Sequence, residues 1–321
     1  MIPLEEIERA RDRIAHTVDR TPLVRLHLDG APAEIWLKLE SLQPIGSFKL
    51  RGAANAILSA PRVELAGGVV TTSTGNMAQG VAFMARALGV PATIVVPDNA
   101  SMSKLAAVER LGGRIVRVSW EAWWAAVEAG SAREAAEGVD GFFVHPVRDE
   151  AVIAGNGTIG LELVEQLDEI DAVLIPWGGG GLTTGIASAL RALSPATKVY
   201  VCEPDTGAPV TAALANGGIP TPVDFTPSFI DGAGSGALLP EMWEHARPLV
   251  NGSFAVSLDD AAATIRLLLE RARIVAEGAA ALPVAAAVAG RAGQGRLVCI
   301  VSGGNIDPTR LAEILSGRTP D

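Results

Sequence analysis

The chain has 321 residues, of which 49% are hydrophobic and 4% aromatic, a length typical of about two domains with sizeable cores. Its 26 basic and 36 acidic residues give a net charge of −10 without a basic cluster, which argues against nucleic acid and anionic membranes as partners. No apolar run reaches the roughly 18 residues of a membrane span and the first residues lack a signal-like pattern, so we expect a cytoplasmic protein whose two cysteines are buried thiols.

The first informative segment is residues 46–53, Gly-Ser-Phe-Lys-Leu-Arg-Gly-Ala, which follows a strand-like run at residues 35–40. Lysine is costly to bury, so a lysine in an apolar, glycine-flanked setting indicates a reactive amine rather than an ordinary surface residue. A desolvated amine attacks carbonyl carbons and forms a Schiff base. Lys49 is therefore the first candidate catalytic residue.

Strand-like runs then alternate with helical patterns almost throughout the chain. In the segment 76–88, for example, Val81, Met84, Ala85 and Leu88 recur at the spacing of one helix face. The predicted strands lie at residues 69–74, 92–97, 114–119, 141–146, 172–177, 198–204 and 296–302. Continuous apolar strands that alternate with helices predict an α/β fold, with mostly parallel sheets and helices on both faces.

Residues 73–76, Ser-Thr-Gly-Asn, end one predicted strand and begin a helix. Such residues are typical of a helix N-cap. The same free N–H groups and hydroxyls can also hold a substrate carboxylate, so both interpretations stay open.

Two glycine-rich segments follow. Residues 155–160 have the G-x-G-x-x-G spacing of dinucleotide-binding loops, but helix or turn precedes them instead of a strand, so we interpret them as close helix packing. Residues 178–181 are four consecutive glycines after the predicted strand 172–177, and they open a helix without the Lys-Ser/Thr of a nucleotide P-loop. A phosphate site together with an aldehyde-reactive lysine points to pyridoxal phosphate as cofactor.

Several short blocks, in their order and spacing, resemble the pyridoxal-phosphate serine/threonine dehydratases and serine racemases, whose fold is similar to the tryptophan synthase β subunit. The blocks are residues 20–23, 38–40, 46–53, 73–76, 178–182, 277–280 and 302–305. The resemblance implies a large cofactor-binding domain of residues 1–52 and 147–321 and a small substrate-side domain of residues 53–146. The chain resembles the short form of these enzymes, which lacks a C-terminal effector-binding module. The resemblance also implies a homo-oligomer, by default a dimer.

The resemblance also implies roles for individual residues. Lys49 holds the cofactor and removes the α-proton, Phe48 packs on the cofactor ring, and the Ser302 hydroxyl faces the pyridine nitrogen, where a neutral partner favours elimination over transamination. The implied cofactor-binding residues are Lys49, Phe48, Asn76, Gly178, Gly179, Gly180, Gly181, Leu182 and Ser302. The implied substrate-binding residues are Ser73, Thr74, Gly75, Asn76 and Met77, and Thr74 is also a catalytic candidate.

Some positions depart from the family pattern. Met77 stands where histidine is common, and Thr74 where racemases have a serine, which disfavours racemisation. Trp177 and Arg148 flank the expected site; a buried tryptophan most often fills core, whereas an arginine can pair with a second substrate carboxylate.

A divalent-cation site of some relatives begins at the residue equivalent to Glu203. Here the second ligand position is Pro209, which has no ligand atom, so too few oxygens are present and we predict no metal.

We therefore expect a lyase of amino-acid metabolism that eliminates water from a β-hydroxy amino acid, threonine or serine by default, to give a 2-oxo acid and ammonia. Alternatives are a dehydratase of threo-3-hydroxyaspartate or of a hydroxyectoine-derived amino acid, an amino-acid racemase and a β-replacement synthase. A non-catalytic sensor would normally lose Lys49, and a nicotinamide dehydrogenase rests on residues 155–160 alone.

Overall fold

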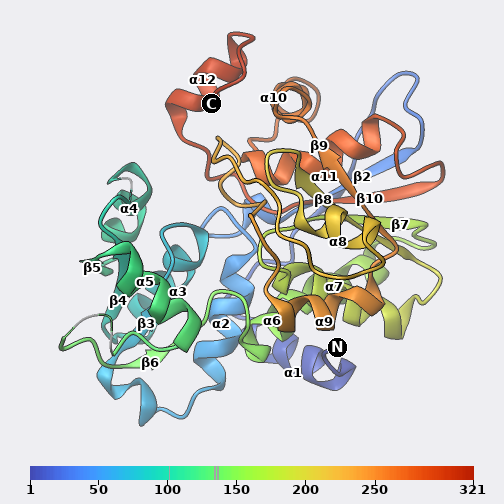
Figure 1. The fold of residues 1–321 in the computed structure, drawn as a ribbon. Helices are drawn as coiled ribbons and strands as arrows, with labels where there is room; N and C mark the ends of the chain where they lie inside the picture. Colours follow the sequence, from blue (N-terminus) through green and yellow to red (C-terminus); the bar gives the residue numbers. More distant parts are fainter. Residues whose placement is uncertain (101, 134, 136) are drawn as a thin grey trace. The chain divides into compact units, whose positions relative to one another are not determined.

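The computed structural model describes residues 1–321 except 101, 134 and 136 (Figure 1). The chain forms two compact units. The large-sheet unit consists of Met1–Ile7, Arg20–Leu42 and Gly157–Asp321, and the small-sheet unit of Glu8–Asp19 and Gln43–Asn156. The predicted domain boundaries stay a prediction, because a compact unit need not be an independently folding domain.

The large-sheet unit contains a six-stranded sheet in the order β1-β2-β10-β7-β8-β9. β1 is antiparallel to β2, and each of the other neighbouring pairs is parallel. The strands are β1 (Leu23–Arg25), β2 (Glu34–Leu39), β7 (Ala172–Pro176), β8 (Lys198–Pro204), β9 (Gly252–Val256) and β10 (Arg296–Val301). Its helices are α7 (Gly181–Leu193), α8 (Pro209–Ala215), α9 (Pro240–Ala246), α10 (Leu258–Leu267), α11 (Gly278–Val288) and α12 (Pro308–Leu315), with short helical turns η1 (Glu40–Leu42), η3 (Arg247–Leu249) and η4 (Leu268–Ala272).

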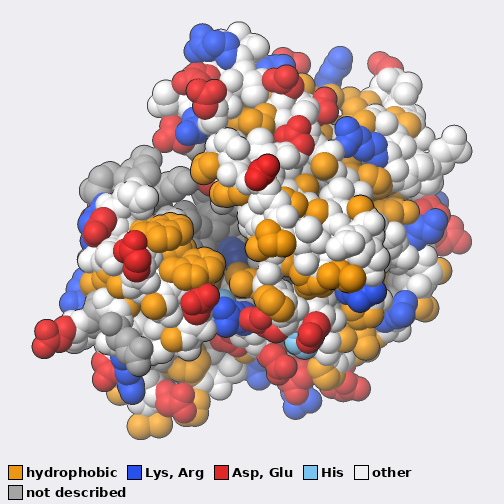
Figure 2. Space-filling model, in the orientation of Figure 1, with side chains coloured by type: hydrophobic (Ala, Val, Ile, Leu, Met, Phe, Trp, Pro, Cys, Tyr) orange, Lys and Arg blue, Asp and Glu red, His pale blue; other side chains and the backbone are white. Residues whose placement is uncertain are grey.

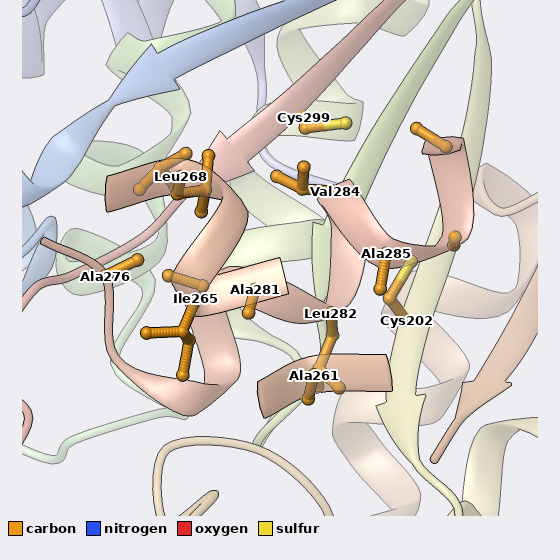
Figure 3. Close-up of a cluster of buried hydrophobic side chains, with 14 of the residues drawn as sticks. Cys202, Ala261, Ile265, Leu268, Ala276, Ala281, Leu282, Val284, Ala285 and Cys299 are labelled. Carbon is orange, nitrogen blue, oxygen red and sulfur yellow. The ribbon is translucent and has the colours of Figure 1, made fainter. Parts of the chain in front are cut away.

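The core of this unit lies around α11, which is apolar on every side and buried from Gly278 to Ala287. In Figure 3, side chains of α11 lie between Ile265 of α10 and the two strand cysteines, Cys202 and Cys299. Both cysteines are free and buried, as the sequence predicted, and burial raises the pKa of each thiol. They are therefore inert core residues.

The small-sheet unit contains a parallel sheet in the order β5-β4-β3-β6. Its strands are β3 (Val69–Thr71), β4 (Ala92–Pro97), β5 (Arg114–Val118) and β6 (Phe142–Phe143). Its helices are α2 (Lys49–Ser59), α3 (Asn76–Leu88), α4 (Met102–Arg110) and α5 (Trp120–Ala129), with the turn η2 (Glu64–Gly67). Helices α1 (Leu4–Ile14) and α6 (Glu150–Gln166) contribute residues to both units.

The predicted α/β class with mostly parallel sheets is confirmed. The bounds predicted for β4, β8 and α3 are those observed, whereas the predicted strand 69–74 stops at Thr71. The edge strands β1 and β9, whose residues are mostly half-buried, were not predicted. None of the helices that the structure describes combines the length and apolar character that a membrane crossing needs.

Two of the sequence blocks form a buried polar network in the large-sheet unit. The Lys38 ammonium is fully buried, forms an ion pair with Glu162, and donates to the Thr21 carbonyl and to Gln166 Oε1, each at 2.8 Å. The Thr21 hydroxyl in turn donates to Glu40 at 2.6 Å. A buried charge requires such partners, and the blocks at 20–23 and 38–40 supply part of them.

Candidate active site

The predicted site residues fall into two sets, one in each unit. In the large-sheet unit, β7 and β10 are parallel neighbours, and Leu174 pairs with Cys299. Their carboxyl ends therefore share one edge of the sheet, where β7 leads into residues 178–181 and β10 into Ser302. Small ligands of open α/β sheets bind at this kind of edge.

The backbone of the glycine loop, residues 178–181, runs so close to its neighbours that side chains at Gly178 and Gly180 would collide with them. Gly180 is the N-cap of α7 and has φ +94°, and a Cβ on it would lie 2.7 Å from Cη2 of Trp177. A Cβ on Gly178 would lie 2.9 Å from the Gly232 carbonyl oxygen. Because these glycines have no side chains, the loop does not cover the first N–H groups of α7, and the positive end of the helix dipole lies at the same place.

The first turn of α7 adds two hydroxyls that the sequence analysis did not single out. Thr183 and Thr184 are fully buried, and neither Oγ1 has a hydrogen-bond partner among the described residues. Nor does any described side chain cap the helix. Unsatisfied buried donors beside an open helix N-terminus fit the phosphate of pyridoxal phosphate, which offers several acceptor oxygens.

Ser302 is 2% exposed, and the glycine that follows it packs against Glu277. The Glu277 N–H donates to the Gly303 carbonyl at 3.0 Å. A Cβ on Gly303 would lie 2.5 Å from Glu277 Oε1, so a side chain there would have to displace the carboxyl group packed on it. The block at 277–280 thus supports the turn that carries Ser302, a role the sequence alone did not reveal.

In the small-sheet unit, Lys49 is the first residue of α2 and its side chain is half-buried. Its Nζ donates to the Pro146 carbonyl at 2.9 Å and lies 5.3 Å from the ring centre of Phe48. The positive end of the helix dipole disfavours a charged amine at this position, whereas the ring face favours one. The amine is thus held by specific groups instead of extending into solvent.

Residues 73–76 connect β3 to α3. The N-cap of α3 is Gly75, and no described side chain caps the helix; instead Ser73 Oγ accepts the Gly75 N–H at 3.2 Å. The N-cap interpretation therefore does not account for the Ser, Thr and Asn side chains. The N-terminus of a helix is a position that suits an anion. β6 is a parallel neighbour of β3, so the loop that holds Lys49 through Pro146 leaves the same sheet edge.

Met77 is 1% exposed and packs in the core of the small-sheet unit. Its side chain is therefore directed into the core, and its backbone N–H is the group that it can offer to a ligand. Two neighbours that the sequence analysis missed, Thr71 and Thr72, are buried with hydroxyls that lack a partner within the described part of the chain. They add donors beside the predicted carboxylate site.

The two flanking positions have different surroundings. Trp177 is 2% exposed and packs edge-on against Trp243, with 6.3 Å between ring centres, so it fills core. Arg148 Nη1 donates to the Glu128 carbonyl at 3.1 Å, near the carboxyl end of α5, where a positive charge is favoured.

Both carboxylate oxygens of Glu203 accept hydrogen bonds from the start of α8. Oε1 accepts from the Val210 N–H, and Oε2 from the N–H and hydroxyl of Thr211, each at 2.9 Å. Burial raises the pKa of Glu203, and these hydrogen bonds oppose the rise. The carboxylate therefore accepts hydrogen bonds from the N-terminus of α8. The absence of a metal stays a prediction.

The G-x-G-x-x-G segment lies inside α6, not between a strand and a helix. Within the small-sheet unit, a Cβ on Gly155 would collide with the Arg51 carbonyl of α2. Within the large-sheet unit, a Cβ on Gly160 would lie 2.7 Å from the Ala189 Cβ of α7. The interpretation as close helix packing is confirmed, and the basis for a dinucleotide site is absent from this segment.

Comparisons with known proteins agree with this chemistry. A family model described as pyridoxal-phosphate dependent enzyme matches residues 14–303. An L-threonine ammonia-lyase of Geobacter sulfurreducens is 38% identical over 322 residues, which cover 98% of this chain and 78% of the relative.

Solved structures give the same result. The structure of a threonine deaminase from T.th. is similar with a TM-score of 0.85 and 35% identity, covering 95% of this chain and 98% of that chain. Maize serine racemase has a TM-score of 0.87 and 32% identity, covering 98% of this chain and 97% of that chain. The match over residues 14–303, with relatives of this identity over nearly the whole length, shows that the chain belongs to the family of pyridoxal-phosphate-dependent enzymes.

Proposed function

We propose that the protein is an ammonia-lyase that eliminates water from a β-hydroxy amino acid, threonine or serine, and releases a 2-oxo acid and ammonia. The observation that carries this proposal is the 38% identity, over 98% of the chain, to a protein named L-threonine ammonia-lyase. Family membership by itself would leave the reaction open, because one fold hosts several pyridoxal-phosphate chemistries.

When bound, pyridoxal phosphate supplies an aldehyde that binds amines covalently and a ring that accepts the electrons left at the substrate α-carbon. We assign covalent attachment to Lys49, the phosphate to Gly178, Gly179, Gly180, Gly181 and Leu182 with Thr183 and Thr184, and the ring nitrogen to Ser302. Support comes from the open N-terminus of α7 and its unpartnered buried hydroxyls. Phe48 and Asn76 are proposed to contact the cofactor ring and its phenolic oxygen.

The substrate carboxylate is assigned to the loop Ser73, Thr74, Gly75, Asn76 and Met77. Support comes from the uncapped N-terminus of α3, whose N–H groups suit an anion. The Lys49 amine, once displaced by the substrate amine, takes the proton from the α-carbon. For this transfer its nitrogen must lie about 3 Å from the substrate α-carbon. The β-hydroxyl takes up a proton and leaves as water, which completes the elimination. Addition of water to the released enamine then gives the 2-oxo acid and ammonia.

A racemase is the second candidate, because maize serine racemase covers nearly all of this chain. The hydroxyl of Thr74 is the group that could return a proton to the opposite face. Threonine carries an extra methyl and a stiff χ1, which restricts that hydroxyl. Chiral analysis of recovered substrate separates the two reactions.

The experiment measures 2-oxo acid release from serine, threonine, threo-3-hydroxyaspartate and hydroxyectoine-derived amino acids, followed by borohydride reduction and peptide mass spectrometry. We expect release from threonine or serine and cofactor on Lys49. Lys49→Arg keeps the charge but cannot carry the cofactor and should be inactive, whereas Lys198→Ala, an exposed lysine of β8, should be unaffected. Cofactor fixed on another lysine, or turnover by Lys49→Arg, would refute the assignment.

Assembly and location are part of the same proposal. We infer a cytoplasmic homodimer that binds an amino-acid substrate and neither nucleic acid nor membrane. The net charge of −10, and the acidic and basic side chains that are interspersed on the face drawn in Figure 2, argue against nucleic acid and anionic membranes as partners. Sedimentation equilibrium that gives a monomer mass would contradict the dimer.

A further inference from the structure

The loop after β6 is closed by one histidine side chain. His145 is 7% exposed, and its Nδ1 accepts the backbone N–H groups of Val147 at 3.1 Å and Arg148 at 2.9 Å. A ring nitrogen that accepts two N–H groups carries no proton, so in the neutral ring the proton is on Nε2. Nε2 lies 3.2 Å from the Val127 carbonyl of α5, to which it donates. The ring thereby closes a tight turn and fastens it to α5.

That turn contains the hydrogen-bond acceptor of the lysine. Pro146 lies between His145 and Val147, and its carbonyl accepts the Lys49 Nζ–H at 2.9 Å. The Pro146 carbonyl and the Val147 N–H belong to one planar peptide unit, so the hydrogen bond from Val147 to the histidine ring also orients this carbonyl. All of these residues belong to the small-sheet unit, which therefore holds the lysine and its acceptor as one assembly.

The proposed function uses the Lys49 amine in two states, covalently attached and free. The free amine must take a proton, so its nitrogen lone pair must face the substrate within hydrogen-bond reach. A lysine side chain has many rotamers, and most of them would move the amine away. A fixed carbonyl that accepts one N–H of the neutral amine restricts the position of the amine nitrogen. It does not engage the nitrogen lone pair, which can then take the proton.

Resting on the proposed function, we propose that the Pro146 carbonyl is the docking point of the Lys49 amine whenever that amine is not covalently bonded. His145 is the positioning residue that holds this carbonyl. It acts on this carbonyl through the turn that it closes. A purely structural role, as an anchor for α5, would instead affect the amount of folded protein and nothing else.

Three variants at position 145 separate the contributions of the ring. His145→Ala removes both ring contacts. His145→Asn keeps a short acceptor for the turn N–H groups and loses the reach to Val127, because asparagine closes such turns. His145→Gln places an amide donor toward Val127 without the short acceptor. Ser119→Ala is the matched control, since it removes the N-cap of α5, where Ser119 Oγ accepts the Ala122 N–H at 3.2 Å, and leaves His145 in place.

Two measurements report on the free amine. The first is the rate at which cofactor-free protein attaches added pyridoxal phosphate covalently, followed by borohydride trapping on Lys49. The second is kcat per bound cofactor together with the isotope effect for α-deuterated substrate. We expect His145→Ala to attach cofactor at least ~10-fold more slowly, to lose ~10-fold or more in kcat and to show a larger isotope effect, with KM nearly unchanged, because general-base catalysis contributes about 10² or more.

The comparison among variants decides the proposal. We expect His145→Asn to stay within about 3-fold of wild type, a small share of the general-base contribution, and His145→Gln to resemble His145→Ala. The proposal is overturned if His145→Ala, or Gln where the alanine variant does not fold, keeps wild-type attachment, kcat and isotope effect, or if Ser119→Ala reproduces its changes. Wild-type protein without lyase activity or without cofactor on Lys49 would instead refute the proposed function.

Discussion

Replacing Gly180 by alanine tests the geometry of the phosphate loop. The backbone there has φ +94°, a conformation that costs a residue with a side chain about 1–2 kcal/mol. The new Cβ would also lie 2.7 Å from Cη2 and 3.0 Å from Cζ2 of Trp177. Trp177 is 2% exposed and packed against Trp243, so it cannot move aside, and overpacking of this kind costs about 1–3 kcal/mol. We therefore expect Gly180→Ala to lower the free energy of unfolding by about 2–5 kcal/mol.

A matched control isolates the steric part. Gly217 has φ +66°, but a Cβ on it would meet no described atom within 4 Å, so Gly217→Ala has the conformational cost alone, about 1–2 kcal/mol. In a Trp177→Phe background, the ring atoms that oppose the new Cβ are gone, and Gly180→Ala should cost about 1–3 kcal/mol less than in the wild type.

Urea denaturation of the cofactor-free proteins measures these differences, and titration with pyridoxal phosphate measures the loop itself. Gly180 caps α7, so a displaced cap moves the first N–H groups away from a phosphate and should weaken cofactor binding, whereas Gly217→Ala should not. The reasoning is refuted if Gly180→Ala is no more costly than Gly217→Ala, or if its cost is the same with Phe at position 177.

Two further predictions concern buried charges. Lys38→Met leaves Glu162 buried without its ion-pair partner and should lower the free energy of unfolding by about 3–5 kcal/mol. Adding Glu162→Leu should recover most of that loss. Urea denaturation that gives the same loss for the single and the double variant would contradict this. For Glu203, burial raises the folded-state pKa above the ordinary value of about 4.3, so its contribution to stability is largest below that pH and decreases as the pH rises through the raised pKa. The unfolding free energy of wild type minus that of Glu203→Gln should therefore fall as the pH rises from about 4. A constant or rising difference would show that the carboxylate is not desolvated.

The sequence by itself was sufficient for the features that depend on neighbours along the chain. The bounds of β4, β8 and α3 follow from apolar runs and helical periodicity, and the order of strand, glycines and helix at residues 172–193 predicted an anion site at the start of α7. The helix or turn expected before residues 155–160 was likewise enough to reject a dinucleotide loop, because that motif requires a preceding strand.

Only the tertiary structure decided which distant residues meet. The Pro146 carbonyl at Lys49 and the Glu277 carboxyl over Gly303 each join a motif residue to a partner whose position depends on packing. The direction of the Met77 side chain, into the core, was equally undetermined by its place beside a predicted site. Local pattern fixes the elements because periodicity is read along the chain, whereas side-chain partners depend on how the elements pack together.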